Sequence, residues 1–446
     1  MLSRLPRVRG LRLHTGIAAA LLVGSGSLAP ALARQTTAPS STIAVARVKA
    51  PLVMGADRLF TEYASLIRGK SVALVSNHSG RLADGTHLAD ALHAGAGKAL
   101  GVRLTVLFGM EYNIRSNDYS LPRDPEHALD SATGVSKYSL YGERHKPTPE
   151  MLKGVDVIIY DIQDVGARFY EHVNILGFVM EAAAEQGIPV VVLDRPNPLG
   201  GRGADGFVAD SAAFYRFGSY TAIPALHGMT PGELARMYQG ERMLRGGVQG
   251  TLHVVPMSGW SRDMWFDDTG LPWQKPSPNL VAFSSLVAYA GTCLFEAVNL
   301  SEGRGSDHPF ELIGAPWLDH QRAVAMLNGL NLPGTRFTAE SFTPTQRSFH
   351  GRPPAFANQS LRGIRLHVTD RAVFKPYRAG VAMLWAVQSL HPDKLEWNDA
   401  VLGRLASTPR LKTMLQAGNT PQQIFAAWAP ELARYEQRAS PYLLYR

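Results

Sequence analysis

The sequence of 446 residues contains a single cysteine, Cys293. One thiol cannot form a disulfide within the chain, and it cannot build a multi-cysteine zinc or iron–sulfur site. The glycine-rich dinucleotide fingerprint is missing after the first predicted strand, and the P-loop, the H-E-x-x-H zinc helix and the G-x-S-x-G nucleophile turn are missing throughout. The sequence therefore predicts neither a cofactor nor a metal, and it leaves chemistry that is carried by carboxylates.

The sequence also has little net positive charge outside its first 33 residues. The chain has 45 Lys and Arg against 37 Asp and Glu, but four of the arginines lie in residues 1–33, which contain no acid. An excess of about four charges on the rest is weak grounds for nucleic-acid binding, so we predict no nucleic-acid partner. The excess suits either a solubilising surface or weak attraction to acidic polymers such as cell-wall glycans.

The amino terminus has the layout of a secretory signal peptide. A basic start is followed by a short apolar run at 17–22 and by the small-residue exit Ala-Leu-Ala, which ends at Ala33. We predict cleavage after Ala33, a flexible leader over 34–51 and export to the periplasm or the medium; an uncleaved anchor is the alternative. No later segment holds 18 consecutive apolar residues, so we expect no stable membrane insertion of the mature protein.

Short apolar runs rich in β-branched residues punctuate the first half of the chain, and helix-like stretches lie between them. The runs are 72–75, 102–108, 155–160 and 190–193, and the helix-like stretches are 86–100 and 173–186. Runs of this kind predict strands that are buried on both faces, as in a parallel sheet. The alternation predicts a doubly wound α/β domain over 52–285.

The last third of the sequence has a different texture. Strand-like pieces occur near 336–342 and 364–369, and helical patterns occur near 379–390 and 397–406. These elements predict a second, smaller α+β domain over 286–446 that closes over the edge of the first sheet. In the middle of the chain, residues 201–279 carry three tryptophans that either stack on sugar rings or belong to the core: Trp260, Trp265 and Trp273.

Polar and charged residues follow every strand predicted in the first domain. The carboxyl ends of parallel strands lie along one edge of a sheet, which is where ligands bind in this architecture. We therefore predict a single site that is assembled from four separate parts of the chain. Its candidate residues are Asn77, His78, Glu111, Arg115, Asp161, Gln163, Asp164, Arg168, Tyr170, Arg195 and Asn197.

Carboxylates without a metal or nucleophile motif indicate general acid–base chemistry, most naturally glycoside hydrolysis. Glu111 is the best candidate for the acid, because it follows a buried strand and desolvation would raise its pKa. Asp161 and Asp164 are candidates for a second carboxylate. The alternative for all three is that they accept hydrogen bonds within their own loops.

A further candidate acid, Glu302, lies in a glycine-rich turn at 301–305, where the backbone can approach a ligand. Its alternative role is a salt bridge with Arg304. The arginines at the predicted edge suggest a substrate with an acid group, because a guanidinium grips a carboxylate through two parallel hydrogen bonds. Internal pairs, such as Asp194 with Arg195, are the competing interpretation. The arginines concerned are Arg115, Arg168, Arg195 and Arg304.

Seven ordered blocks resemble one known family. They are SNHSG at 76–80, DIQDVGARFY at 161–170, LDRPNP at 193–198, HGMT at 227–230, PSPN at 276–279, SEGRG at 301–305 and GAPW at 314–317. Together they are similar to the NamZ exo-β-N-acetylmuramidases, and the similarity extends from about residue 52 to the carboxyl end.

This resemblance implies a Rossmann-like catalytic domain, a smaller carboxyl-terminal domain and a cleft between them. It also implies release of N-acetylmuramic acid from the non-reducing end of peptidoglycan fragments. The lactyl carboxylate of that sugar would account for the arginines, and its 2-acetamido group can take the place of a protein nucleophile. We therefore predict Glu111, Asp164 and Glu302 as catalytic and the remaining candidates as substrate-binding.

One block departs from the family pattern. Relatives read G-P-E-H-G-I-R-G, whereas this chain reads G-M-E-Y-N-I-R-S at 109–116. Glu111 and Arg115 are retained, but Tyr112 and Asn113 replace the histidine and glycine beside the acid. The departure leaves two other hypotheses open, a muropeptide-binding protein without catalysis and a hydrolase of another acidic amino sugar.

Overall fold

The structure is a computed structural model that describes residues 51–110, 113–116, 124–142, 144–216, 218–345 and 353–446. The predicted signal peptide, nearly all of the predicted leader and the candidate acid Glu111 lie outside the described residues. Residues 49–446 fall into one compact unit.

A seven-stranded sheet forms the centre of the first half of the chain, in the order β3-β4-β2-β1-β5-β6-β9. All the described neighbours in it pair in parallel except β3 and β4, which are antiparallel. Four strands match the predicted runs: β1 (Ser71–Ser76), β2 (Arg103–Gly109), β5 (Val157–Asp161) and β6 (Val190–Leu193). The others are β3 (His127–Leu129), β4 (Ser136–Ser139) and β9 (Leu252–Val255).

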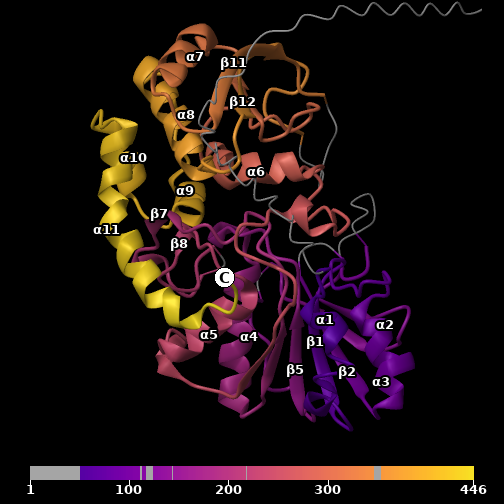
Figure 1. The fold of residues 1–446 in the computed structure, drawn as a ribbon. Coiled ribbons are helices and arrows are strands. Elements are labelled where there is room, and N and C mark those ends of the chain that lie inside the picture. The colour runs from indigo at the N-terminus through magenta and orange to yellow at the C-terminus, as the bar shows by residue number, and fades with distance from the viewer. Residues whose placement is uncertain (1–50, 111–112, 117–123, 143, 217, 346–352) are drawn as a thin grey trace, which may run out of the picture. The chain divides into compact units, whose positions relative to one another are not determined.

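Helices cover both faces of this sheet, which confirms the predicted fold class (Figure 1). On one side lie α1 (Gly55–Arg58), α2 (Leu88–His93) and α3 (Gly95–Ala99), and on the other lie α4 (His172–Gln186) and α5 (Pro231–Gly240). Successive side chains of a strand point to opposite faces. Accordingly Ala73 and Val75 join the core beside α4, whereas Val72 and Leu74 join the core beside α2.

The predicted helix at 86–100 is two helices instead of one. Ala94 between α2 and α3 has extended dihedrals, φ −126° and ψ −167°, and it ends the first helix. The chain there is rich in glycine, which is a poor helix former because it has the most backbone freedom to lose. The predicted helix at 173–186 is a single helix, α4, and it ends at Gly187 in the left-handed conformation.

The second half of the chain builds a three-stranded antiparallel sheet with helices. The sheet has the order β10-β12-β11, with β10 at Leu312–Ala315, β11 at Thr335–Phe342 and β12 at Leu361–Val368. The helices are α6 (Phe283–Thr292), α7 (His320–Gly329), α8 (Pro376–Leu390), α9 (Asp399–Leu405), α10 (Arg410–Gln416) and α11 (Pro421–Ala439). None of the described helices has the length and apolarity needed to cross a membrane.

Helices α6 and α8 approach each other closely at two glycines. A Cβ atom on Gly291 would overlap the carbonyl oxygen of Pro376, and one on Gly380 would overlap the carbonyl oxygen of Gly291. Only glycine allows the two backbones to come this near. The contact forms part of a continuous core that also includes residues of α4 and α11.

Shorter elements complete the fold. A two-stranded sheet pairs β7 (Asp205–Val208) with β8 (Pro224–Leu226), and single 3₁₀ turns occur at Ala64–Leu66, Arg168–Tyr170, Ser211–Ala213, Arg245–Gly247, Phe266–Thr269, Cys293–Ala297 and Ser440–Tyr442.

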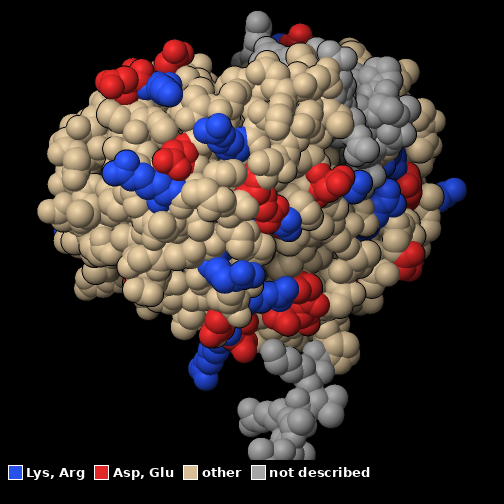
Figure 2. Space-filling model, turned by 90° about the horizontal axis from the view of Figure 1, so that it is seen from above, with Lys and Arg blue, Asp and Glu red and all other residues tan. Residues whose placement is uncertain are grey.

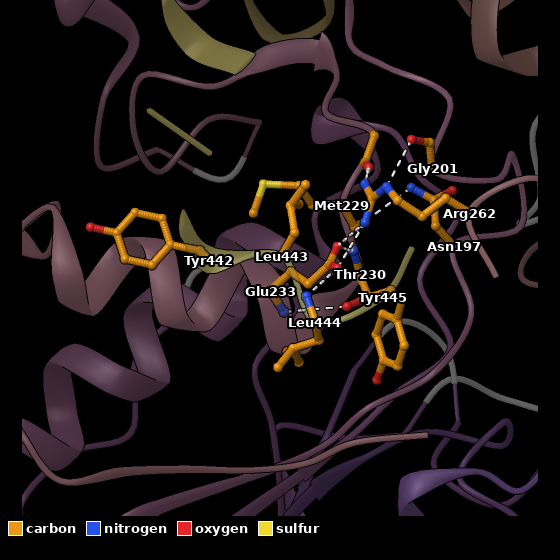
Figure 3. A network of polar contacts seen from close by, with 12 residues as sticks. Asn197, Gly201, Met229, Thr230, Glu233, Arg262, Tyr442, Leu443, Leu444 and Tyr445 are labelled. Carbon is orange, nitrogen blue, oxygen red and sulfur yellow. Dashed lines mark hydrogen bonds and ion pairs between the residues drawn. The ribbon is translucent and has the colours of Figure 1, made fainter. Parts of the chain in front are cut away.

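The carboxyl-terminal residues return to the first half of the chain. Figure 3 shows Glu233 of α5 between the guanidinium of Arg262 and the backbone of Leu444. The hydroxyl of Tyr445 donates to Asp194 at the end of β6, at 2.6 Å. The end of the sequence therefore fixes loops at the carboxyl edge of the central sheet.

Candidate active site

A small hollow opens where β1 and β5 end side by side. The two strands pair in parallel, with Ser76 opposite Asp161, so the loops that follow them emerge together. The hollow is lined in part by Asn77, His78, Gln163 and Asp164. The structure thus brings together four of the residues that the sequence predicted for one site. They come from two places, 77–78 and 163–164, that lie more than 80 positions apart in the chain.

Asp164 is the buried carboxylate of this hollow. Its Oδ2 accepts the backbone N–H of Gly166 at 2.7 Å and lies 3.3 Å from Nε2 of His227. Its Oδ1, which is 4.0 Å from Nδ1 of His172, accepts no hydrogen bond from any described residue. A buried polar oxygen without a partner is rare and marks a place where a ligand can bind.

The charge of Asp164 is stabilised by its neighbours. Burial raises the pKa of Asp164, but the contact with His227 and the nearby His172 outweigh burial and bring the pKa below its ordinary value. The side chain is therefore a carboxylate at neutral pH. A group in this state can stabilise positive charge but is a poor proton donor.

His227 is a functional candidate that the sequence reasoning did not select. Its Nδ1 accepts the backbone N–H of Met229 at 3.3 Å, which leaves the proton on Nε2, the nitrogen that faces Asp164. The signal in the sequence was its place in the block at 227–230. Nothing in the sequence says that this block meets the loop after β5.

Gly166 makes the turn after Asp164 possible. Its φ of +82° suits glycine, and a Cβ atom there would overlap Oδ1 of Asn197. The side chain of Asn197 accepts the N–H of Leu199 at 2.9 Å and donates to the carbonyl of Met229 at 3.0 Å. Asn197 therefore holds the loop after β6 against the Asp164 turn, and it lines a second, narrow pocket together with Gly166.

The amides of Asn77 and Gln163 hold the walls of the hollow in place. Oδ1 of Asn77 accepts from both the N–H and the hydroxyl of Ser79, at 2.9 and 2.5 Å. Gln163 donates its amide to the carbonyls of Pro196 and Asp164, at 2.7 and 2.9 Å. Gln163 therefore connects the loop after β5 to the loop after β6, and Asn77 shapes the loop after β1.

A segment at 273–276 closes the hollow on another side. Nε2 of His78 lies 2.9 Å from the carbonyl oxygen of Lys275, and the hydroxyl of Tyr170 donates to the carbonyl oxygen of Pro276 at 2.5 Å. Trp273 lines the hollow. The other two tryptophans of this region belong to the core, with exposed fractions of 5% for Trp260 and 6% for Trp265.

Arg168, a predicted substrate contact, is engaged within the protein. Its guanidinium is fully buried, and it donates to the carbonyl oxygens of Gly218, Leu405 and Ala406, at 2.9, 3.0 and 3.2 Å, and to the hydroxyl of Ser407. Burial lowers the pKa of Arg168 to about 10, so the group remains charged at neutral pH. It caps the last carbonyls of α9 and fastens the two halves of the chain together.

Two further predicted substrate-binding arginines are also engaged within the protein. Arg195 forms a bidentate pair with the buried Asp161, at 2.5 and 2.9 Å. Arg115 pairs with Asp130 at 2.6 and 2.9 Å and with Asp90 at 2.7 Å. The charges of Arg115, Arg195 and Asp161 are therefore already matched within the protein, and their roles in substrate binding stay predictions.

Glu302 and Arg304 form an internal pair as well, which was the alternative interpretation of this turn. Arg304 contacts Glu302 and also pairs with Glu296 at 2.7 Å. Glu302 is outside the hollow that Asp164 lines, so the structure does not support a catalytic role beside Asp164. A row of ring contacts leads from Arg304 toward Asp164 through Phe310, Tyr289, Tyr170 and His172.

Charges of both signs are mixed on the surface that Figure 2 shows. Lys and Arg side chains stand beside Asp and Glu side chains there, and neither sign gathers into one extended patch. A surface of this kind differs from the basic stripe of a nucleic-acid-binding face.

Comparisons with known proteins agree with the block pattern of the sequence. Residues 72–284 match the model of the exo-β-N-acetylmuramidase NamZ N-terminal domain, and residues 287–445 match the model of its C-terminal domain. The peptidoglycan β-N-acetylmuramidase NamZ of Bacillus subtilis is 38% identical over 392 residues, which is 88% of this chain and 91% of that protein.

Solved structures give the same result. Two crystal structures of DUF1343 family proteins from Bacteroides fragilis superpose with TM-scores of 0.79 and 0.71, at 31% and 28% identity. Each alignment covers 89% of this chain and 99% of the other. On these grounds the chain belongs to the NamZ exo-β-N-acetylmuramidase family.

Proposed function

We propose that this protein is an exo-acting glycoside hydrolase that releases N-acetylmuramic acid from the non-reducing end of peptidoglycan fragments. The observation that carries the proposal is the 38% identity with a peptidoglycan β-N-acetylmuramidase over nearly the whole chain. The Oδ1 of Asp164 supports it, because it accepts no hydrogen bond from the described residues and lies at the carboxyl edge of the sheet, where ligands bind in such folds.

In the proposed mechanism Glu111 and Asp164 have different tasks. A carboxylate whose pKa is low, such as Asp164, stays ionised and stabilises the oxocarbenium-like charge that develops on the sugar. The proton for the leaving oxygen then comes from Glu111. His227 acts as a positioning residue, because its contact fixes Asp164 and keeps it anionic.

The catalytic assignment is tested with a 4-nitrophenyl glycoside of N-acetylmuramic acid. We expect purified protein to release 4-nitrophenol. Because 4-nitrophenolate leaves with little help from an acid, Glu111→Gln is compared with the wild type on a peptidoglycan fragment, whose sugar leaving group needs a proton, and it should release N-acetylmuramic acid about 100-fold more slowly or worse. Glu150→Gln changes an exposed acid that is not among the predicted site residues, and it serves as the matched control. Equal release by the wild-type protein and Glu111→Gln would remove Glu111 from the mechanism.

The departure at Tyr112 and Asn113 favours one alternative function. Tyr112 is next to Glu111 and Asn113 follows it, so both replacements lie beside the proposed acid. The alternative is that the chain binds muropeptides without cleaving them. Calorimetry distinguishes the two functions. Binding of N-acetylmuramic acid glycosides without release of product would support the binding protein, and turnover would exclude it.

We also propose that the protein is exported after cleavage behind Ala33. The basic, apolar and small-residue order of residues 1–33 supports this, and a peptidoglycan substrate lies outside the cytoplasm. Amino-terminal sequencing of protein recovered from the periplasm or medium should begin at Arg34. Recovery of the uncleaved chain from the cytoplasm alone would contradict the proposal.

A further inference from the structure

A groove with a volume of about 610 Å³ lies on a part of the protein that the proposed mechanism does not use. It runs between the residues 210–216 and 218–219 on one side and the helices α9 and α10 on the other, and its size is typical of ligand sites. None of its lining residues lines the hollow at Asp164.

Two arginines at this groove have no acidic partner. Arg216 and Arg404 are exposed, and no carboxylate of the described residues forms an ion pair with either of them. Both acids that line the groove already have a cation: Asp399 pairs at 2.6 Å with Lys412, which also lines the groove, and Asp210 lies 3.2 Å from the guanidinium of Arg410. The groove is left with two guanidinium groups whose charge is not matched.

A third guanidinium lies directly beneath the groove. Arg168 donates to the carbonyl oxygen of Gly218 and to the hydroxyl of Ser407, and both of these residues line the groove. All its described partners are neutral oxygens, so no carboxylate cancels its charge. A charge in the poorly polarisable interior acts over a longer range than one in water. The groove therefore attracts anions from below as well as from its rim.

We propose that this groove binds an acidic peptide, specifically the carboxylate-bearing stem peptide of a peptidoglycan fragment. Guanidinium groups bind carboxylates through paired hydrogen bonds, and peptide recognition by arginine clusters uses the same contacts. The described lining residues include no aromatic ring on which a sugar could stack, which favours a peptide over a glycan. The choice of the stem peptide rests on the proposed function, whereas the unmatched positive charge does not.

The test measures binding of the fluorescently labelled tripeptide L-Ala-γ-D-Glu-meso-diaminopimelate by anisotropy. We expect saturable binding to the wild-type protein that weakens when the salt is raised from about 50 to about 300 mM. The double variant Arg216→Ala/Arg404→Ala should bind about tenfold more weakly or worse, because both guanidinium forks are lost. Arg68→Ala/Arg336→Ala, which removes two exposed arginines outside the groove, should bind like the wild type.

Three results would overturn the proposal. The first is that the wild type does not bind the tripeptide saturably, and the second is that both double variants lose the same amount of affinity. The third is that the groove variant loses affinity for peptide-free muramyl glycan but not for the tripeptide. Release of 4-nitrophenol from the muramic acid glycoside reports separately on the hydrolase. If the wild type binds the tripeptide through Arg216 and Arg404 but releases no nitrophenol, the groove stands and the proposed hydrolase fails. If the wild type releases nitrophenol but does not bind the tripeptide, the proposed hydrolase stands and the groove proposal fails.

Discussion

Two neighbouring strands, β5 and β6, each lead into a buried aspartate, but the surroundings of the two acids differ. Asp164 follows β5, and its Oδ1 has no hydrogen-bond partner among the described residues. Asp194 follows β6 directly and accepts hydrogen bonds from Tyr445 at 2.6 Å, Thr230 at 2.8 Å and the N–H of Gly232 at 2.8 Å. The first acid has capacity left for a ligand, and the second has none to spare.

The region around Asp194 is closed by the far end of the chain. Both carboxylate oxygens of Glu233 accept from one guanidinium nitrogen of Arg262, at 2.8 and 3.0 Å, and one of them also accepts the backbone N–H of Leu444 at 2.9 Å (Figure 3). The pair of regions shows that an acid at a strand end is not by itself a sign of catalysis. What separates a site from a structural network is whether other segments satisfy the acid.

Replacing each aspartate by asparagine should separate the two regions most strongly. Asp164→Asn removes the charge that we propose stabilises the sugar in the transition state, so we expect kcat/KM on the muramic acid glycoside to fall by about 100- to 10,000-fold while the protein stays folded. Asp194→Asn should lower thermal stability but retain kcat per folded molecule. Activity assays beside thermal unfolding measure both. An active Asp164→Asn would contradict the assignment of the site.

The saturated network should tolerate the loss of a charge poorly. Arg262→Met leaves Glu233 buried without its cation, and we expect the free energy of unfolding to fall by about 3–5 kcal/mol. Arg371→Met breaks the exposed pair with Asp267 and should cost about 1 kcal/mol or less. Urea titration compares the two variants. Similar losses would show that burial of the first pair has no energetic consequence.

The burial of Asp194 predicts that the stability of the protein depends on pH, and the hydrogen bond from Tyr445 modifies that dependence. Burial raises the pKa of Asp194 from 3.8 to about 7, so its contribution to stability is complete below about pH 4 and is lost as the pH rises through 7. Tyr445→Phe removes a donor to the charged form and should cost about 1–2 kcal/mol, more at pH 8 than at pH 5.

Tyr442→Phe is the matched control, because its hydroxyl bonds the half-buried Glu241 near the surface. We expect this variant to lose little stability at either pH. Urea titrations at pH 5 and pH 8 measure both variants. A loss for Tyr445→Phe that is larger at pH 5 would reverse the sign that we assign to Asp194.

The smallest effect is expected at the wall of the open hollow. Trp273→Leu removes one aromatic face beside Asp164, and an aromatic contact is worth about 0.5–1.5 kcal/mol, so KM should rise about two- to tenfold while kcat changes little. Trp260→Leu, in the core, should lower stability instead. A fall in kcat without a change in KM would mean that Trp273 does not contact the substrate.

Four strands of the central sheet, β1, β2, β5 and β6, and the helix α4 were predictable because local sequence decides them. Continuous apolar runs such as 190–193 can be stable only where both faces are covered, and this run is β6 without change. The short strands β3 and β4 were not predicted, because their residues are only partly buried and lack an apolar pattern. The break at Ala94 was also missed, since it depends on backbone dihedrals within a helix-like pattern.

The sequence by itself determined the class of fold, the edge of the sheet where polar residues gather, and the family. It could not decide which of those residues remain open to a ligand. Arg115, Arg168, Arg195 and Arg304 all looked like substrate contacts, yet each meets an acid or a carbonyl within the protein. For Arg168 and Arg195 the partner comes from a distant segment, whereas Arg304 pairs with the nearby Glu296. Only tertiary structure decides this, because a charged group is satisfied by whichever partner the fold brings within hydrogen-bonding distance.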